Sequence, residues 1–430
     1  MKQNGLQACI RPVATMLLLG ASVLASPAHA QSWQGIKDQG TQAGLTPSVV
    51  YDGDALANTS GGARRGVTYL GSLHLQMALD FDRLAGIPGL TGWVEGLWLQ
   101  GGQATGLVGD AQGVSNVAGP AGLRPYEAWL QYNLLGSRVS LLAGLYDLNL
   151  EFYRLRSAGL FLNSSFGIGP EFSQSSPNGP SIFPVTSLGF RLAVKPTANT
   201  IIRTAIMDAV PLDPPNQPPN TFDAHNGVLI VTEAAYFFRP PASAPPNFSR
   251  SLIGRRSDLS PYEDKIALGG WYYTSSFNDL SAVTSTGAPV QRHGEAGAYA
   301  LLDQTLYQSG EDPKRHVSGF LQLGVADQSV DRFARYIGAG LNAGGLVPSR
   351  PDDEFGVAVA IARNGNSYMQ SQLEANQPVT RAETTVEISY LSQLTPWLAM
   401  QPDLQWVFSP NTDPRRRTAI VAQLHFEASF

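Results

Sequence analysis

The chain has 430 residues, of which 34 are acidic and 29 are basic, and only 15% are charged. A chain with so few charges and a mildly acidic balance lacks the basic surface that binds nucleic acid, so we exclude a nucleic-acid partner. Aromatic residues make up 9% of the chain, whereas apolar stripes with the i, i+3, i+4 spacing of helices are scarce. The spacing of apolar residues therefore favours strands.

Residues 1–30 have the pattern of a secretory signal peptide. Lys2 and Arg11 precede the apolar stretch VATMLLLGASVLA, and the following SPAHA places Ala28 and Ala30 at the small positions of a cleavage site. We therefore expect these residues to be removed on export. The alternative is an N-terminal anchor that is retained.

The exported part, residues 31–430, is expected to fold without disulfides. The only cysteine is Cys9, and loss of the leader leaves 27 basic against 34 acidic residues. This part contains no apolar run near the roughly 18 residues that mark a membrane helix. Only about 13 residues precede the first predicted strand, which leaves no room for a plug domain.

Apolar and polar residues alternate along most of the exported chain. In VTYLGSLHLQMALDF, residues 67–81, one face carries Val67 and Leu75 and the other carries Thr68 and His74. Since successive strand side chains point to opposite faces, this is a half-buried strand, and it is longer than usual in globular proteins. The predicted strands are 44–58, 67–81, 91–102, 126–135, 138–147, 187–195, 200–208, 227–238, 264–276, 294–307, 316–326, 332–343, 354–363, 380–391, 397–408 and 417–430.

The connections between these segments alternate between long and short. Odd-numbered connections are mostly long and polar, as in residues 148–186, whereas even-numbered ones are mostly tight, as in residues 136–137 and 392–396. An even number of strands with long outer loops and short inner turns is typical of bacterial outer-membrane barrels. The exception is 239–263, which is too long for an inner turn.

The C-terminal run TAIVAQLHFEASF indicates which face meets lipid. Ile420, Leu424 and Phe430 share one face, and Gln423 and His425 share the other. The polar faces of such strands mix both charges with amides, unlike the Lys- and Glu-rich faces of a soluble sandwich. Because sixteen strands leave an interior too wide for side chains to fill, the sequence predicts an all-β transmembrane antiparallel β-barrel around an aqueous channel. The terminal Phe then lies at the membrane boundary.

Four stretches resemble the carbohydrate-selective porins of the OprB family and together span nearly the whole exported chain. They are YDGDALANTSGGARRG (51–66), LFLNSSFG (160–167), GLVPSRPDDEFGVAVA (345–360) and LTPWLAMQPDLQWVFSP (394–410). The resemblance implies a Gram-negative outer-membrane porin of sixteen strands that lets mono- or small oligosaccharides diffuse passively into the periplasm. It does not fix which sugar is preferred.

The loop 148–186 is the main candidate for the channel constriction. It carries five aromatic residues that are too apolar to remain in water: Phe152, Tyr153, Phe161, Phe166 and Phe172. We expect it to fold back into the lumen and to present four polar residues at the narrowest point: Glu151, Arg154, Arg156 and Asn163. The alternative is a cap packed over the outer mouth.

Residues of the wall are expected to complement this loop. Glu127, Arg191 and Arg203 lie on neighbouring predicted strands, and Arg64 and Arg65 belong to the first outer loop. Arg and carboxylate side chains suit pairs of adjacent sugar hydroxyls, so these residues are predicted to bind substrate. For Arg64 and Arg65, contact with lipid phosphate is an equal alternative.

Two further sets of residues have weaker signals. Arg415, Arg416 and Arg417 form a charge run in the last outer loop. There it is either solvated or in contact with lipopolysaccharide phosphates. His74 and His425 project inward as isolated histidines without ligand spacing, so we expect hydrogen bonding in the lumen and neither a metal nor a cofactor.

Other functions remain as alternatives. A general or other small-solute porin, or an adhesin or receptor, would share the barrel. A barrel enzyme would need a nucleophile with its base, and the sequence has no G-x-S-x-G or comparable signature. A secreted β-propeller would show internal repeats, which are absent from the sequence. Whether protomers form a homo-oligomer is left open.

Overall fold

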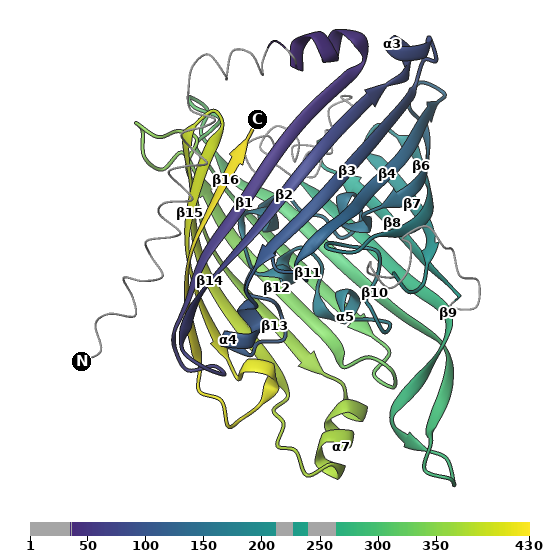
Figure 1. Cartoon of the computed structure of the whole chain (residues 1–430), viewed down its shortest axis with the longest axis vertical. Helices are drawn as coiled ribbons and strands as arrows, with labels where there is room; N and C mark the ends of the chain where they lie inside the picture. Colours follow the sequence, from purple (N-terminus) through teal and green to yellow (C-terminus); the bar gives the residue numbers. More distant parts are fainter. Residues whose placement is uncertain (1–34, 36, 212–226, 240–263) are drawn as a thin grey trace.

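Sixteen antiparallel strands close into a barrel in the part of the chain that the structure describes (Figure 1). The computed structural model describes residues 35, 37–211, 227–239 and 264–430. The strands are β1 (Leu45–Ser60), β2 (Gly66–Asp80), β3 (Leu90–Gly101), β4 (Gly122–Leu134), β5 (Val139–Tyr146), β6 (Ser187–Thr197), β7 (Thr200–Asp208), β8 (Val228–Phe237), β9 (Lys265–Val283), β10 (Pro289–Gln308), β11 (His316–Ala326), β12 (Phe333–Gly344), β13 (Glu354–Asn364), β14 (Ala382–Thr395), β15 (Leu398–Phe408) and β16 (Ala419–Ser429). The predicted fold class is confirmed.

The barrel closes where the last strand pairs with the first. β16 lies antiparallel to β1, with Val50 opposite Ser429 and Ala57 opposite Ala422. The backbone N–H of Val49 donates to Phe430 O at 3.1 Å, and the N–H of Phe430 donates to Val49 O at 2.9 Å. The chain end is thus part of the ladder, and closure leaves no edge strand unpaired in lipid.

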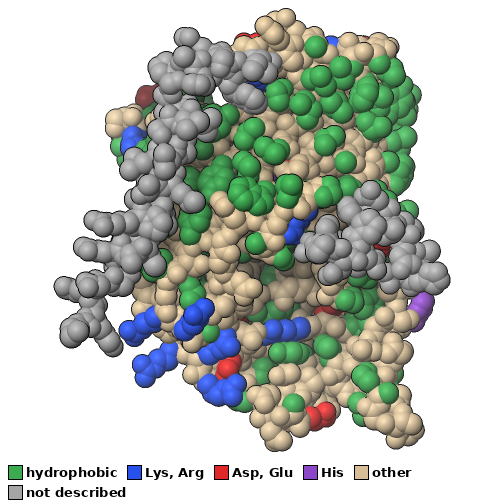
Figure 2. Space-filling model, in the orientation of Figure 1, with side chains coloured by type: hydrophobic (Ala, Val, Ile, Leu, Met, Phe, Trp, Pro, Cys, Tyr) green, Lys and Arg blue, Asp and Glu red, His purple; other side chains and the backbone are tan. Residues whose placement is uncertain are grey.

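The two faces of the strands divide as the alternation predicts. On β16, Leu424 is 39% exposed on the outer face, whereas Gln423, His425 and Glu427 are buried on the inner face. Hydrophobic side chains spread over the wall in Figure 2, and Lys and Arg side chains gather toward its lower left. In the described ranges, no helix is long and apolar enough to cross a membrane.

The structure corrects the predicted boundaries of one hairpin. The connection predicted for 277–293 is largely strand, because β9 and β10 run on to a short turn, with Val283 opposite Pro289. This extension mixes polar and apolar residues on both faces, and an ion pair joins Arg292 Nη2 to Asp279 Oδ2 at 2.8 Å. Because both faces are mixed, the alternation that marks the other strands is missing there.

Smaller differences occur in the connections. Phe81, predicted as the end of a strand, begins the short helix α3 (Phe81–Ala85), and the outer loop after β13 contains α7 (Asn366–Glu374). The predicted signal peptide, residues 1–30, lies outside the described residues. The same is true of the unusual segment 239–263 beyond its first residue.

The loop between β5 and β6 lies inside the barrel, as predicted. It contains the short helices η1 (Leu148–Leu150), η2 (Ser157–Leu160), η3 (Ser164–Phe166) and α5 (Pro170–Ser173), and α5 is seen within the barrel in Figure 1. The five aromatic side chains predicted to leave water are all buried, none more than 3% exposed. The structure therefore supports the fold-back of this constriction loop and not a cap over the mouth.

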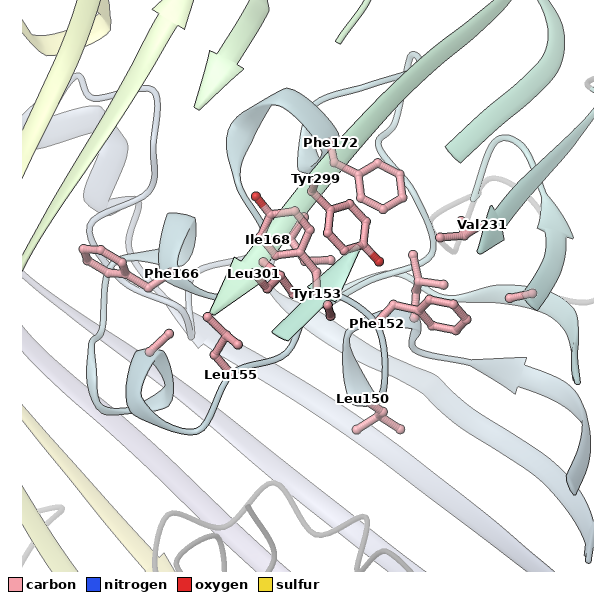
Figure 3. Close-up of a cluster of buried hydrophobic side chains, with 14 of the residues drawn as sticks. Leu150, Phe152, Tyr153, Leu155, Phe166, Ile168, Phe172, Val231, Tyr299 and Leu301 are labelled. Carbon is pink, nitrogen blue, oxygen red and sulfur yellow. The ribbon is translucent and has the colours of Figure 1, made fainter. Parts of the chain in front are cut away.

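Glycines in the wall create space for the rings that hold the constriction loop. Trp271 lies over Gly297, and its ring stacks on Phe172 of the loop with centroids 4.2 Å apart. Tyr299 lies over Gly269 in the same way and contacts Tyr153 of the loop at 4.4 Å between centroids. Figure 3 shows these loop rings directed against the wall.

We predict that Gly297→Val destabilises the barrel. An added Cβ would lie 2.0 Å from Trp271 Cζ2, so the indole and the ring stacked on it must move. Overpacking of this kind costs about 1–3 kcal/mol. The temperature at which the purified protein loses its folded migration on gels should fall. Gly310→Val is the matched control, because nothing lies within 4 Å of the added Cβ there. Equal melting of the two variants would contradict the prediction.

Candidate substrate channel

Carboxylates of the wall hold the backbone of the constriction loop. The N–H groups of Leu162 and Asn163 donate to the two oxygens of Glu387 at 2.6 and 3.0 Å. Likewise, Ser157 N–H donates to Asp303 at 2.7 Å. The short helices of the loop satisfy only part of its buried N–H groups, and for these three the inward-facing carboxylates supply the acceptors.

An ionic network fixes the beginning of the loop. Glu151 accepts from Arg191 Nε at 2.7 Å and from Tyr146 Oη at 2.6 Å, and Arg203 Nε lies 3.6 Å away. Burial alone would raise the pKa of Glu151, but Arg191 and Arg203 outweigh it and hold the pKa below its ordinary value. Across the network, Arg203 Nη1 lies 3.7 Å from Glu233. Glu151 is thus an ionised, buried anchor.

The predicted site residues divide into three groups. Most are buried anchors: besides the Glu151 network, Glu127 accepts from Asp147 N–H at 3.0 Å, and Asn163 Nδ2 donates to Gln405 at 3.1 Å. The two loop arginines are only half-buried. Arg154 Nη1 donates to Leu150 O at 3.2 Å, and Arg156 Nη1 lies 3.3 Å from His316 Nε2.

The third group is Arg64 and Arg65, which the structure does not bring to the constriction loop. Both are exposed at the outer rim, where Arg64 Nε donates to Gly106 O at 3.3 Å. Gly106 belongs to the short helix α4 (Ala104–Val108) of the second outer loop.

The open space at the constriction lies between the loop and the strands around the closure. A cavity of about 200 Å³ is lined on the loop side by Arg154 and Phe161, and on the wall side by Asp52, His74 and His425. Its surface therefore combines a cation and an aromatic ring with a carboxylate and two imidazoles. Of the predicted polar loop residues, Arg154 and Asn163 reach this cavity.

The carboxylate partners of the two histidines on the wall side of the cavity were not predicted from the sequence. His74 and His425 were predicted to be isolated, but each pairs with a carboxylate: His74 Nδ1 lies 2.7 Å from Glu95 Oε1, and His425 Nδ1 lies 2.5 Å from Asp54 Oδ1. The alternation places these side chains inward, whereas only the β1–β16 pairing brings Asp54 beside His425. Among the described residues, no cluster of His, Cys, Asp or Glu has a geometry that could hold a metal ion.

Glu171 is a second buried carboxylate of the loop, and within the described ranges no cation pairs with it. It lies on α5, where Tyr153 Oη donates to its Oε1 at 2.8 Å. Burial raises the pKa of Glu171 to about 7. This acid therefore changes its protonation state near neutral pH, which a paired carboxylate would not do.

We predict that Glu171 makes the folded loop more stable at pH 5 than at pH 8. The pKa is about 7 in the folded protein and near 4.5 in the unfolded chain, so the folded state holds an extra proton between these values. Its stability is therefore lost as the pH rises through that window, by an amount on the order of 3 kcal/mol.

Thermal unfolding at pH 5 and pH 8 measures this effect. In Glu171→Gln the side chain stays neutral, so the difference between the two midpoints should shrink. Glu374→Gln, on the exposed face of α7, should keep the wild-type difference. An unchanged pH dependence in Glu171→Gln would contradict the assignment.

Comparison with known proteins agrees with this architecture. The family model described as "Carbohydrate-selective porin, OprB family" matches residues 64–430. Porin B of Pseudomonas aeruginosa is 23% identical over 182 residues, which cover 37% of this chain and 40% of that protein. The chain thus aligns with less than half the length of this curated relative.

Solved structures show the same fold. The high-pH structure of Pseudomonas putida OprB has a TM-score of 0.79 and 19% identity, covering 93% of this chain and 97% of that one. The low-pH structure of the same protein has a TM-score of 0.56 and 18% identity, with 93% and 96% coverage. The matched family and the closed barrel are those of a Gram-negative outer-membrane channel rather than of an enzyme.

Proposed function

Because the chain belongs to the carbohydrate-selective porin family OprB, we propose that it lets mono- and small oligosaccharides diffuse passively across the outer membrane into the periplasm. The observation that carries this proposal is the cavity between the constriction loop and the wall. Its mixed polar and aromatic lining suits a neutral, hydroxylated solute. The family match favours this function over a general porin or an adhesin.

The loop side of the cavity supplies two features that sugars need. The Arg154 guanidinium offers parallel N–H donors to adjacent hydroxyl oxygens. Phe161 and Leu155 line the same cavity, and the small apolar surface that each leaves uncovered suits the C–H face of the ring. The buried residues Glu151 and Asn163 then act by holding the loop that presents these groups.

The wall residues Glu127, Arg191 and Arg203 act in the same way in this proposal. None of the three side chains lines the cavity, and each is buried, with Glu127 0%, Arg191 1% and Arg203 6% exposed. No chemical step is needed, because diffusion through a fixed opening requires only positioning and partial desolvation.

We predict that Arg154→Ala weakens the block of ion current by sugars about tenfold, which corresponds to the loss of one charge-assisted hydrogen bond. Arg156→Ala should have a smaller effect, because its guanidinium lies beside His316 and is not part of the cavity lining. Single-channel recording in planar bilayers with added sugars gives the half-blocking concentration.

Arg335→Ala, which removes an exposed arginine from β12, serves as the control and should behave like the wild type. An unblocked wild-type channel would contradict the sugar function itself. A normal block in Arg154→Ala would exclude this arginine from the site.

We also propose that the outer rim binds lipopolysaccharide phosphate. Gly62 N–H donates to Arg417 O at 3.0 Å, so closure of the barrel joins the first and last outer loops. Together they carry five arginines, of which Arg64 and Arg416 donate to the backbone oxygens of Gly106 in α4 and of Gly109 after it; the other three are Arg65, Arg415 and Arg417. Figure 2 shows basic side chains gathered at this end of the barrel. Asp413 neutralises Arg415 at 2.9 Å, which leaves a net positive patch.

We predict that the double substitution Arg65→Glu and Arg417→Glu lowers the amount of lipopolysaccharide that copurifies with the protein. Each basic residue near a lipid surface contributes about 1 kcal/mol, so reversing two charges should weaken binding by more than roughly tenfold. The control is Arg138→Glu with Arg315→Glu, two exposed residues at inner turns. Equal lipopolysaccharide in both variants would contradict this role.

A further inference from the structure

Three carboxylates and two imidazoles alternate across four neighbouring strands at the barrel closure. His74 on β2 lies between Glu95 on β3, at 2.7 Å from Nδ1, and Asp52 on β1, at 3.5 Å from Nε2. His425 on β16 continues the row, with Asp54 at 2.5 Å from Nδ1 and Asp52 at 3.7 Å from Nε2. Asp52 is therefore the centre of the row, and the two histidines flank it.

The two outer carboxylates of the row are fully engaged. Glu95 Oε2 accepts from Trp93 Nε1 at 3.2 Å and from Gln76 Nε2 at 3.3 Å. Asp54 accepts a short hydrogen bond from Ser115 Oγ of the second outer loop. These contacts fix both carboxylates, and each carboxylate in turn fixes the orientation of its imidazole. Glu95 and Asp54 are therefore positioning residues.

Asp52 differs from its neighbours in the row. Its contacts with the two imidazoles are long: the Nε2 atoms of His74 and His425 lie 3.5 and 3.7 Å from its oxygens, at ion-pair separations, whereas the Nδ1 atoms lie 2.7 and 2.5 Å from Glu95 and Asp54. The residue is only 8% exposed, and that exposure is to the cavity at the constriction. Asp52 is therefore the carboxylate of the row that a ligand in the cavity can reach and to which it can donate hydrogen bonds.

The cavity places opposite chemistry on its other side. Arg154 of the constriction loop lines the same space, and a guanidinium only donates hydrogen bonds, whereas a carboxylate only accepts them. A ligand that satisfies both walls must therefore donate on one side and accept on the other. Neutral sugars do so, because each hydroxyl both donates and accepts.

We propose that Asp52 is the acceptor half of the sugar site and selects neutral sugars over sugar acids, an inference that rests on the proposed sugar channel. Two adjacent hydroxyls donate to the two carboxylate oxygens, while Arg154 binds hydroxyl oxygens on the opposite side of the ring. A sugar carboxylate in the same position meets Asp52 as a like charge, with Glu95 and Asp54 behind it. His74 and His425 hold the Asp52 carboxylate at the cavity wall.

The test compares glucose with glucuronate as blockers of the full-length channel in planar bilayers at pH 7.5. We expect the wild type to be blocked by glucose at a lower concentration than by glucuronate. Asp52→Asn should weaken the block by glucose about tenfold and should leave the block by glucuronate unchanged or stronger. Asp82→Asn removes one carboxylate from the exposed helix α3 and should match the wild type.

The outcomes separate this inference from the sugar function on which it rests. A wild-type channel that neither sugar blocks overturns the sugar function. A wild-type channel blocked by glucose, with an identical block in Asp52→Asn, overturns the role of Asp52 alone. An equal loss of block for glucose and glucuronate also overturns the role, because a general change in pore charge or packing would give that result. Asp52→Glu keeps the charge, and restored preference for glucose in it supports the assignment.

Discussion

The structure depends on one constraint: in lipid, every backbone N–H and C=O must find its partner within the protein. A sheet of strands meets this requirement only when it is closed, since an open edge would leave a row of unpaired groups in hydrocarbon. Here the pairing of β1 with β16 closes the sheet, and it continues to the last residue through Phe430. A chain that ended several residues earlier would lose part of this seam.

The same constraint explains the inside of the barrel. The constriction loop is buried and forms only short helices, so some of its N–H groups pair outside the loop. Inward-facing acids accept them instead, as Glu387 does for Leu162 and Asn163. The apolar rings of the loop then pack on wall rings for which glycine leaves room, as Phe172 does on Trp271, which lies over Gly297. In a soluble protein the inner face of a sheet is apolar and the loops are polar. Here the inner face of the wall carries the polar groups and the loop carries the apolar rings.

The strands and the closed barrel could be predicted from the sequence, because they depend on the pattern of neighbouring residues. Alternation is a property of neighbouring residues, so each predicted strand overlaps a strand of the structure. The prediction from alternation failed at the β9–β10 extension, where both faces mix polar and apolar residues. The aromatic content of residues 148–186 likewise predicted burial of the loop. The hydrogen-bond partners of Glu151 and Asn163 could not be predicted. Arg191 and Gln405 lie on strands that are far from the loop in the sequence.

The cavity wall shows why the candidate site was harder to predict than the fold. His425 and Asp54 are 371 positions apart, and neither has a local motif, so each looks like an ordinary lumen residue until the strands are paired. Once closure joins β16 to β1, the registers of β1 with β2 and of β2 with β3 set Glu95, His74 and Asp52 in line. The row is thus a product of the ladder that keeps the barrel intact in lipid. The most specific chemistry of the channel therefore lies at the seam where the first strand meets the last.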